Sequence, residues 1–288
     1  DHRDLPSFPT RRSSDLRWAP PAVPAPAPLR GGPRNRALEA VLGALNVCSK
    51  EWKSRSYDGE VKGLSVGKPF VGVRSDVPAD ATVMRIEPGA PDGIVLAEGI
   101  NPFYSDLDTY AMMASVIDEA VRRAISAGGT LAHLAGLDNF CWPDPVPSAG
   151  HPDGEQKMAQ LVRANQALFD VTTAYGVPCV SGKDSMKNDS VRGGRRISIP
   201  PTVLFSVIGR MADVSKLVTV DFKRPGDLVY VAGLTRDERG ASEFHRWLYE
   251  EPGTPGAFGG TVPALHIPAA RSLYDGRARA IASGRLGS

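Results

Sequence analysis

Two long stretches of the chain repeat apolar side chains at helical spacing. Residues 108–127 carry them every three or four positions and end at Gly128 and Gly129, which predicts one helix. Residues 154–175 predict a second helix that Gly176 terminates. Asp153 and Gln156 have the spacing of a capping box at its start. The apolar face expected for this second helix is Met158, Leu161, Val162, Leu168 and Phe169.

Shorter apolar runs predict strands between and after these helices. The expected strand regions are 61–73, 82–86, 93–97, 131–137, 177–180, 203–208 and 228–232. Two further helices are expected at 37–45 and 267–285. The chain therefore mixes helices and strands, and no internal repeat is visible.

The composition is that of a globular protein. Of 288 residues, 42% are hydrophobic and 23% are charged, and the length suits about two domains. No apolar run is long enough for a membrane span, and no secretory signal pattern is found. Three separated cysteines without a CxxC pair favour a reducing, cytoplasmic location. We expect no membrane partner.

Residues 1–36 differ from the rest of the chain. They hold eight prolines, seven Arg and three Asp, which predicts a disordered, Pro- and Arg-rich segment. The opening run resembles translated sequencing-adapter sequence, so we expect the first 16 or so residues to be non-native; a transit peptide is the alternative. The other residues carry 27 basic and 29 acidic side chains, so no nucleic-acid partner is expected.

A polar motif follows the expected strand at 177–180. Residues 181–185 read Ser-Gly-Lys-Asp-Ser, and such Gly, Lys and Ser residues at a strand end suit a phosphate. A Walker A pattern is absent, and a plain polar turn is the alternative. Asp138 and Asn139 also follow an apolar strand, where polar side chains often face a ligand crevice.

Other candidate residues have simpler alternatives. Asp80 and Glu119 could supply two carboxylates to Mg²⁺, or they could lie on solvated surfaces. Cys141 could be a nucleophile, although we expect Cys141 and Cys179 to be packed as small apolar residues. His133 is expected in the core.

Eight segments in order resemble one enzyme family, the phosphoribosylformylglycinamidine synthases. The segments are 46–52, 57–61, 99–104, 115–120, 137–142 (Leu-Asp-Asn-Phe-Cys-Trp), 175–178, 181–188 (Ser-Gly-Lys-Asp-Ser-Met-Lys-Asn) and 199–202. Each is weak alone, but their order and spacing agree with the family over about residues 37–245.

The resemblance implies an α+β fold like that of aminoimidazole ribonucleotide synthase. The chain is similar to the second half of the family's synthetase portion. It would comprise a first α+β domain at 37–214 and the start of an incomplete α/β domain at 215–288. The catalytic residues would lie in the missing first half, so we expect this chain alone to be inactive. That first half and a glutaminase domain or subunit are the implied protein partners.

The resemblance also implies roles for individual residues. Asp138 and Gly182 match nucleotide-contacting positions, and Ser185 matches a substrate-contacting one. Lys183 aligns with a metal-contacting Asn of the smaller family form and could instead offer charge to a phosphate.

The same resemblance assigns Asp80 and Glu119 to Mg²⁺ at an auxiliary nucleotide site. The long family form has Asn four residues after this Glu, whereas this chain has Arg123. The sequence therefore departs from the family pattern at the auxiliary metal site.

The implied reaction uses ATP and Mg²⁺. The ATP γ-phosphate would activate the formamide oxygen of formylglycinamide ribonucleotide, and glutamine-derived ammonia would then displace phosphate. Another ATP-using member of the superfamily, such as a selenophosphate synthase-like protein, is one alternative. A non-catalytic, nucleotide-binding structural half is another.

Overall fold

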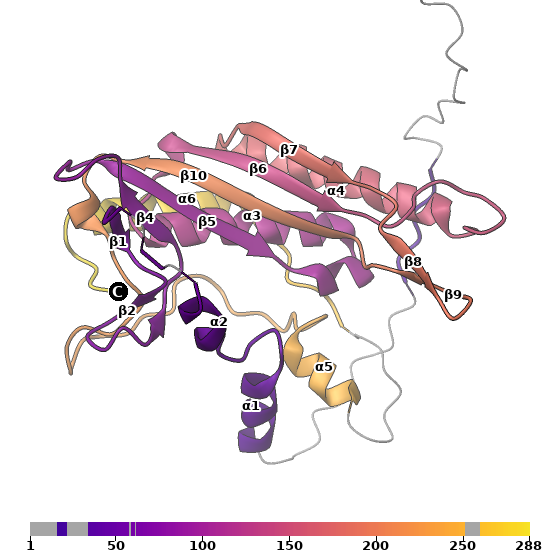
Figure 1. The fold of residues 1–288 in the computed structure, drawn as a ribbon, viewed down its shortest axis with the longest axis horizontal. Coiled ribbons are helices and arrows are strands. Elements are labelled where there is room, and N and C mark those ends of the chain that lie inside the picture. Colours follow the sequence, from indigo (N-terminus) through magenta and orange to yellow (C-terminus); the bar gives the residue numbers. More distant parts are fainter. Residues whose placement is uncertain (1–15, 22–33, 58, 61, 251–259) are drawn as a thin grey trace, which may run out of the picture.

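A six-stranded mixed sheet with long helices on one face organises the chain (Figure 1). The computed structural model describes residues 16–21, 34–57, 59–60, 62–250 and 260–288. In spatial order the strands are β1 (Ser65–Gly67), β4 (Thr82–Arg85), β5 (Gly93–Ile100), β10 (Thr202–Met211), β6 (Leu134–Cys141) and β7 (Cys179–Ser185). Only the β6–β7 pair among these is parallel, because α4 connects them as a crossover helix. Two small hairpins join β2 (Phe70–Val71) to β3 (Val77–Pro78) and β8 (Asp189–Arg192) to β9 (Arg195–Ser198).

Three helices form a layer on one face of the sheet. They are α3 (Thr109–Ser126), α4 (Gly154–Tyr175) and α6 (Ile267–Ala282). Helices α1 (Arg34–Gly43), α2 (Glu51–Arg55) and α5 (Glu243–Glu250) lie to one side of the sheet (Figure 1). The 3₁₀ segments are η2 (Pro102–Asp106), η3 (Leu131–His133) and η4 (Val214–Lys216). This arrangement confirms the α+β class. Within the described residues, no helix combines the length and apolarity that a membrane span needs.

The core lies between this helix layer and the sheet. Met112, Met113 and Ile117 on α3 are fully buried, as are Val95 and Phe205 on the sheet. Helix α3 begins where the sequence predicts it, because the Asp108 carboxylate accepts hydrogen bonds from the first-turn N–H groups.

Helix α4 has the predicted bounds, and its predicted apolar face is only partly right. Leu161 and Leu168 pack against the core and are partly buried, whereas Phe169 is 65% exposed. The fully buried residues are smaller ones, including Ala164, Ala167 and Val171. The close packing of α4 on α3 favours such small side chains at the contact. The capping box is also absent: the Asp153 carboxylate makes no capping hydrogen bond.

The predicted strands that belong to the six-stranded sheet are found in the structure, with some shifts of their ends. Strand β6 begins three residues after the predicted start, because residues 131–133 form η3. The predicted strand at 228–232 is wrong. That segment is irregular and exposed, and it pairs with no strand of the part of the chain that the structure describes.

The N-terminal prediction is partly wrong. Most of the segment expected to be disordered, residues 1–15 and 22–33, lies outside the described residues, as does nearly all of the expected non-native run. Residues 34–36, however, already belong to α1. In the described stretch 16–21, the Trp18 ring lies 3.8 Å from the Arg163 guanidinium on α4.

One buried carboxylate ties the three layer helices together. Asp118 Oδ1 on α3 accepts hydrogen bonds from Tyr175 Oη on α4 (2.7 Å) and Tyr274 Oη on α6 (2.5 Å). The C-terminal helix thus joins the same core as α3 and α4. The proposed domain boundary near residue 215 stays a prediction.

Candidate functional site

Strands β6 and β7 bring the predicted nucleotide residues side by side. Asp138 pairs with Gly182 in the parallel register, and both face the helix layer. A Cβ on Gly182 would overlap Asp138 Oδ1, so the glycine leaves room for the carboxylate. Partial burial, and then the charge of Asp184, raise the pKa of the Asp138 carboxyl above its usual range.

Asp184 is a site residue that the motif analysis missed. It lies on the same strand face as Gly182, two positions further on. The period of two along a strand was the signal that could have found it, but only once residues 181–185 are recognised as strand rather than turn. The polar-turn alternative is wrong, since β7 runs through to Ser185.

The motif's lysine and last serine face the opposite, open side of the sheet. Lys183 pairs with Asn139, and Ser185 pairs with Cys141. The exposed Lys183 side chain places its Nζ 3.9 Å from Cys141 Sγ. Asn139 Oδ1 is buried without a hydrogen-bond partner. The Lys183 ammonium suits an anionic group of a ligand, whereas the unsatisfied Asn139 Oδ1 is an acceptor and suits a hydrogen-bond donor of a ligand.

Ser185 is already held by a neighbouring side chain. Its hydroxyl hydrogen-bonds to the Asn188 amide, which also reaches Trp142 O at 3.3 Å. The predicted site residues on these strands thus lie near one another but on two faces: Asp138 and Gly182 on one, Lys183 and Ser185 on the other.

Arg123 contacts both residues that were predicted to bind Mg²⁺, but only one of their carboxylates. Arg123 Nε donates to the Asp80 carbonyl oxygen at 2.8 Å, and its guanidinium lies 3.7 Å from Glu119 Oε1. Glu119 Oε2 accepts from the Ile100 N–H at 3.2 Å. Arg123 already supplies a positive charge beside the Glu119 carboxylate, so Glu119 does not fit Mg²⁺ well. The assignment stays a prediction.

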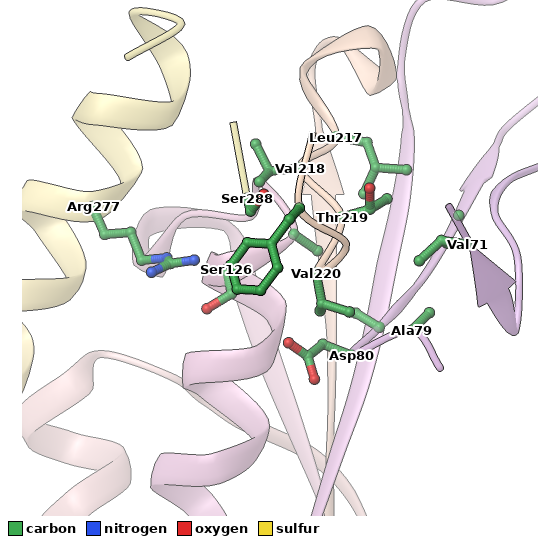
Figure 2. A pocket seen from close by; sticks show the side chains of 14 residues that line it. Val71, Ala79, Asp80, Ser126, Leu217, Val218, Thr219, Val220, Arg277 and Ser288 are labelled. Carbon is green, nitrogen blue, oxygen red and sulfur yellow. The ribbon is translucent and has the colours of Figure 1, made fainter. Parts of the chain in front are cut away.

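Asp80 also borders a cavity of about 250 Å³ between the sheet edge and α6 (Figure 2). Arg277 enters it from α6, opposite Asp80, and Arg277 Nε is buried without a hydrogen-bond partner. Apolar side chains, including Leu217 and Val220, form much of the wall. This cavity is separate from the β6–β7 edge.

The remaining candidates have plainer environments. Cys141 is half-buried, in line with a packed thiol, and Cys179 is exposed on β7. His133 is exposed on η3, so its predicted core position is wrong. The reason is that the buried strand begins only after it.

Comparison with known proteins finds relatives among subunits of one biosynthetic synthase. The chain is 30% identical over 243 residues to the phosphoribosylformylglycinamidine synthase subunit PurL of Methanocaldococcus jannaschii, covering 84% of this chain and 30% of that protein. It is 33% identical over 223 residues to the same subunit from Ignicoccus hospitalis, covering 76% of this chain and 29% of that protein. No family model matches the chain.

Among solved structures, Thermotoga maritima PurL complexed with ADP aligns with 27% identity and a TM-score of 0.41. The alignment covers 60% of this chain and 25% of that one. From the sequence matches, the chain is a homologue of the PurL subunit over most of its length, which confirms the resemblance found in the motifs. It spans about 30% of the length of these curated relatives.

Proposed function

We propose that this chain forms part of an ATP-dependent carbon–nitrogen ligase of purine biosynthesis. The reaction would convert formylglycinamide ribonucleotide and glutamine-derived ammonia to formylglycinamidine ribonucleotide. The observation that carries the proposal is the identity to PurL subunits, which covers 84% of the chain in the M. jannaschii relative. The motif on β6 and β7 lies within the matched part of the chain.

The β6–β7 edge would bind phosphate groups of ATP or of the substrate. Lys183 would offset phosphate charge, and the Ser185 hydroxyl would donate a hydrogen bond. Asp138 with Gly182 would contact the nucleotide. ATP supplies the phosphate that makes the formamide oxygen a leaving group, so the protein's task is to hold and neutralise charge.

Catalysis would need a second protein unit. Under this proposal the catalytic residues and the glutaminase lie outside this chain, so the chain alone is inactive. The enzyme would be cytoplasmic. The sheet face opposite the helices supports a partner, because it carries exposed apolar side chains such as Ile100 and Ile208. The first half of the synthetase is the proposed occupant.

A chimera tests the function directly. The segment of M. jannaschii PurL that aligns with this chain is replaced by it, and formylglycinamidine ribonucleotide is measured with ATP and ammonia. We expect turnover from the chimera and none from the chain alone. Lys183→Ala should lower kcat/KM by tenfold or more, whereas Lys53→Ala on the exposed helix α2 should leave it unchanged. A well-folded but inactive chimera would contradict the proposal.

A non-catalytic, nucleotide-binding structural half is the second candidate. Arg123 favours it, because its guanidinium pairs with Glu119, one of the two residues predicted to bind Mg²⁺. Binding of a fluorescent ATP analogue to the chain, with and without Mg²⁺, separates the two. Mg²⁺-independent binding that Lys183→Ala does not weaken would favour the structural role.

A further inference from the structure

Three potential metal ligands converge beyond the ends of β6 and β7. They are Asp144 in the loop after β6, His151 just before α4 and Asp189 at the start of β8. One donor atom from each residue lies within 4.8 Å of the others. None of the three belongs to the site described above.

Two of these side chains have buried atoms without a partner. His151 Nδ1 and Asp189 Oδ1 are shielded from solvent and make no hydrogen bond. Leaving buried polar atoms unsatisfied costs about 1–3 kcal/mol each, so such atoms call for an explanation. A cation between them would satisfy both.

Each carboxylate is already oriented through its other oxygen. Asp189 Oδ2 accepts from the Asp144 N–H and from Arg196, both at 3.0 Å. Asp144 Oδ1 accepts from the Val146 N–H at 2.9 Å. These bonds resemble the outer-shell contacts that orient metal ligands, and they leave Asp189 Oδ1 and Asp144 Oδ2 available.

We propose that Asp144, His151 and Asp189 bind one divalent transition-metal cation of the zinc type. His151 Nδ1 lies 3.6 Å from Asp144 Oδ2 and 3.9 Å from Asp189 Oδ2. Ligands about 2.0–2.1 Å from a tetrahedral zinc ion lie about 3.3 Å apart, so the His151–Asp144 pair needs only a small contraction. Asp189 would present its free Oδ1 to the ion, because Arg196 and the Asp144 N–H hold its Oδ2. One imidazole with two carboxylates suits zinc better than Mg²⁺ or Ca²⁺, which prefer all-oxygen sites.

The loop between β6 and α4 is conformationally restricted without a bound cation. Ser148 and His151 exchange backbone hydrogen bonds of 3.2 and 2.9 Å. Prolines 143, 145, 147 and 152 restrict the backbone around them. Little conformational entropy would therefore be lost on binding.

Two cations of the protein already stand near the carboxylates. Lys187 Nζ is 3.7 Å from Asp144 Oδ2, but its side chain is 63% exposed and can turn into solvent. Arg196 contacts the Asp189 oxygen that the metal would not use. An ion-pair network that binds no metal is thus the competing account, and the experiment must separate the two.

Zinc titration of the chain by calorimetry, with Co²⁺ absorption as a second probe, tests the proposal. We expect one Zn²⁺ per chain, a higher melting temperature with Zn²⁺, and a tetrahedral Co²⁺ spectrum. His151→Asn and Asp189→Asn should each weaken binding at least tenfold. His133→Asn and Asp227→Asn, which remove an exposed histidine and an exposed aspartate, should leave it unchanged.

Three outcomes would overturn the proposal. The first is the absence of saturable binding to folded wild-type chain. The second is loss of binding in His133→Asn rather than in His151→Asn. The third is a sulfur-to-cobalt charge-transfer band, which would assign the ion to a cysteine. Circular dichroism identifies any variant that fails to fold. The His151 side chain is a quarter exposed, so we expect His151→Asn to fold. If Asp189→Asn does not fold, zinc binding by His151→Asn tests the proposal.

The site would also fix the neighbouring Ser185–Asn188 turn. Asp189 follows that turn directly, and Asn188 already bonds to Trp142 two residues before Asp144. The inference does not depend on the proposed ligase function, since the zinc titration needs neither ATP nor substrate.

Discussion

At the residue scale, Asp118 is the most consequential buried charge in the described chain. Its carboxylate accepts hydrogen bonds from two tyrosine hydroxyl groups and also forms an ion pair with Arg122 at 3.0 Å. Burial of a carboxylate is tolerated only when such partners replace water. Asp118 therefore stabilises the contact among α3, α4 and α6. Each tyrosine hydroxyl should contribute measurably to the free energy of unfolding.

Removing one hydroxyl tests that network. Tyr274→Phe should lower the free energy of unfolding by about 1–2 kcal/mol, because it deletes a buried hydrogen bond to a charged group. Urea unfolding followed by circular dichroism measures the change. Tyr230→Phe is the matched control, since Tyr230 is exposed and should shift stability by less than about 0.5 kcal/mol. Equal stability of the two variants would mean that the Asp118 contact contributes nothing.

The same tyrosines predict a loss of stability in alkali. Burial, and then the Asp118 carboxylate, raise the pKa of Tyr175 and Tyr274 above the ordinary value of 10.0. Above pH 10 the unfolded chain releases these protons while the folded chain keeps them. The unfolding free energy should then fall by about 1.4 kcal/mol per pH unit for each tyrosine.

Urea unfolding at several pH values above 10 checks this slope. The wild type should lose stability more steeply than Tyr274→Phe, by about 1.4 kcal/mol per pH unit. Parallel curves for the two proteins would show that the folded Tyr274 ionises as readily as the unfolded one.

Residue chemistry in the site was predictable from sequence, but its geometry was not. The residue types at 181–185 indicated a phosphate site, and Asp138 at a strand end indicated a ligand crevice. Their division between two sheet faces follows from β6–β7 register, which depends on contacts far apart in the chain. The Asp144, His151 and Asp189 cluster was missed for the same reason, since its members are brought together only by the fold.

At the element scale, local signals fixed helix ends better than helix faces. Gly176 ends α4 in the left-handed conformation, with φ of 70°, as its sequence position predicts. Which side of α4 is buried depends instead on α3. Apolar residues on both sides of the helix made the periodicity ambiguous, and packing selected the small ones.

Two truncations on α4 test which face carries the packing energy. Val171→Ala should cost about 2 kcal/mol, because Val171 is fully buried and its removal leaves a cavity. Phe169→Ala removes a larger side chain but should cost less than about 0.5 kcal/mol, because Phe169 is mostly exposed. Urea unfolding measures both. The reverse order would restore the face predicted from the sequence.

The failed strand at 228–232 shows the limit of pattern alone. Its Leu-Val-Tyr-Val-Ala run has strand composition, yet a strand is stable only beside another strand. No described strand lies next to it, so the backbone stays irregular.

At the scale of the whole molecule, the described helices cover the sheet on one side only. Helices pack on the face with Val95 and Phe205, whereas Ile100 and Ile208 on the other face are 49% and 41% exposed. An apolar sheet face of this kind tends to be covered by a second protein surface. Under the proposed function, the first half of the synthetase covers this face. When that half is absent, we expect a second copy of this chain to cover it instead.

Self-association of the isolated chain through this face is therefore expected. Analytical ultracentrifugation should show a sedimentation coefficient that rises with concentration for the wild type. Ile208→Lys should abolish the rise without lowering the melting temperature, because burying a charge against an apolar surface opposes association. Val191→Lys, on the exposed β8–β9 hairpin, is the matched control and should associate like the wild type. If the wild type stays monomeric at every concentration, or if both lysine variants lose association equally, the open sheet face is not the contact. The surface that binds the first half of the synthetase would then lie elsewhere on the chain.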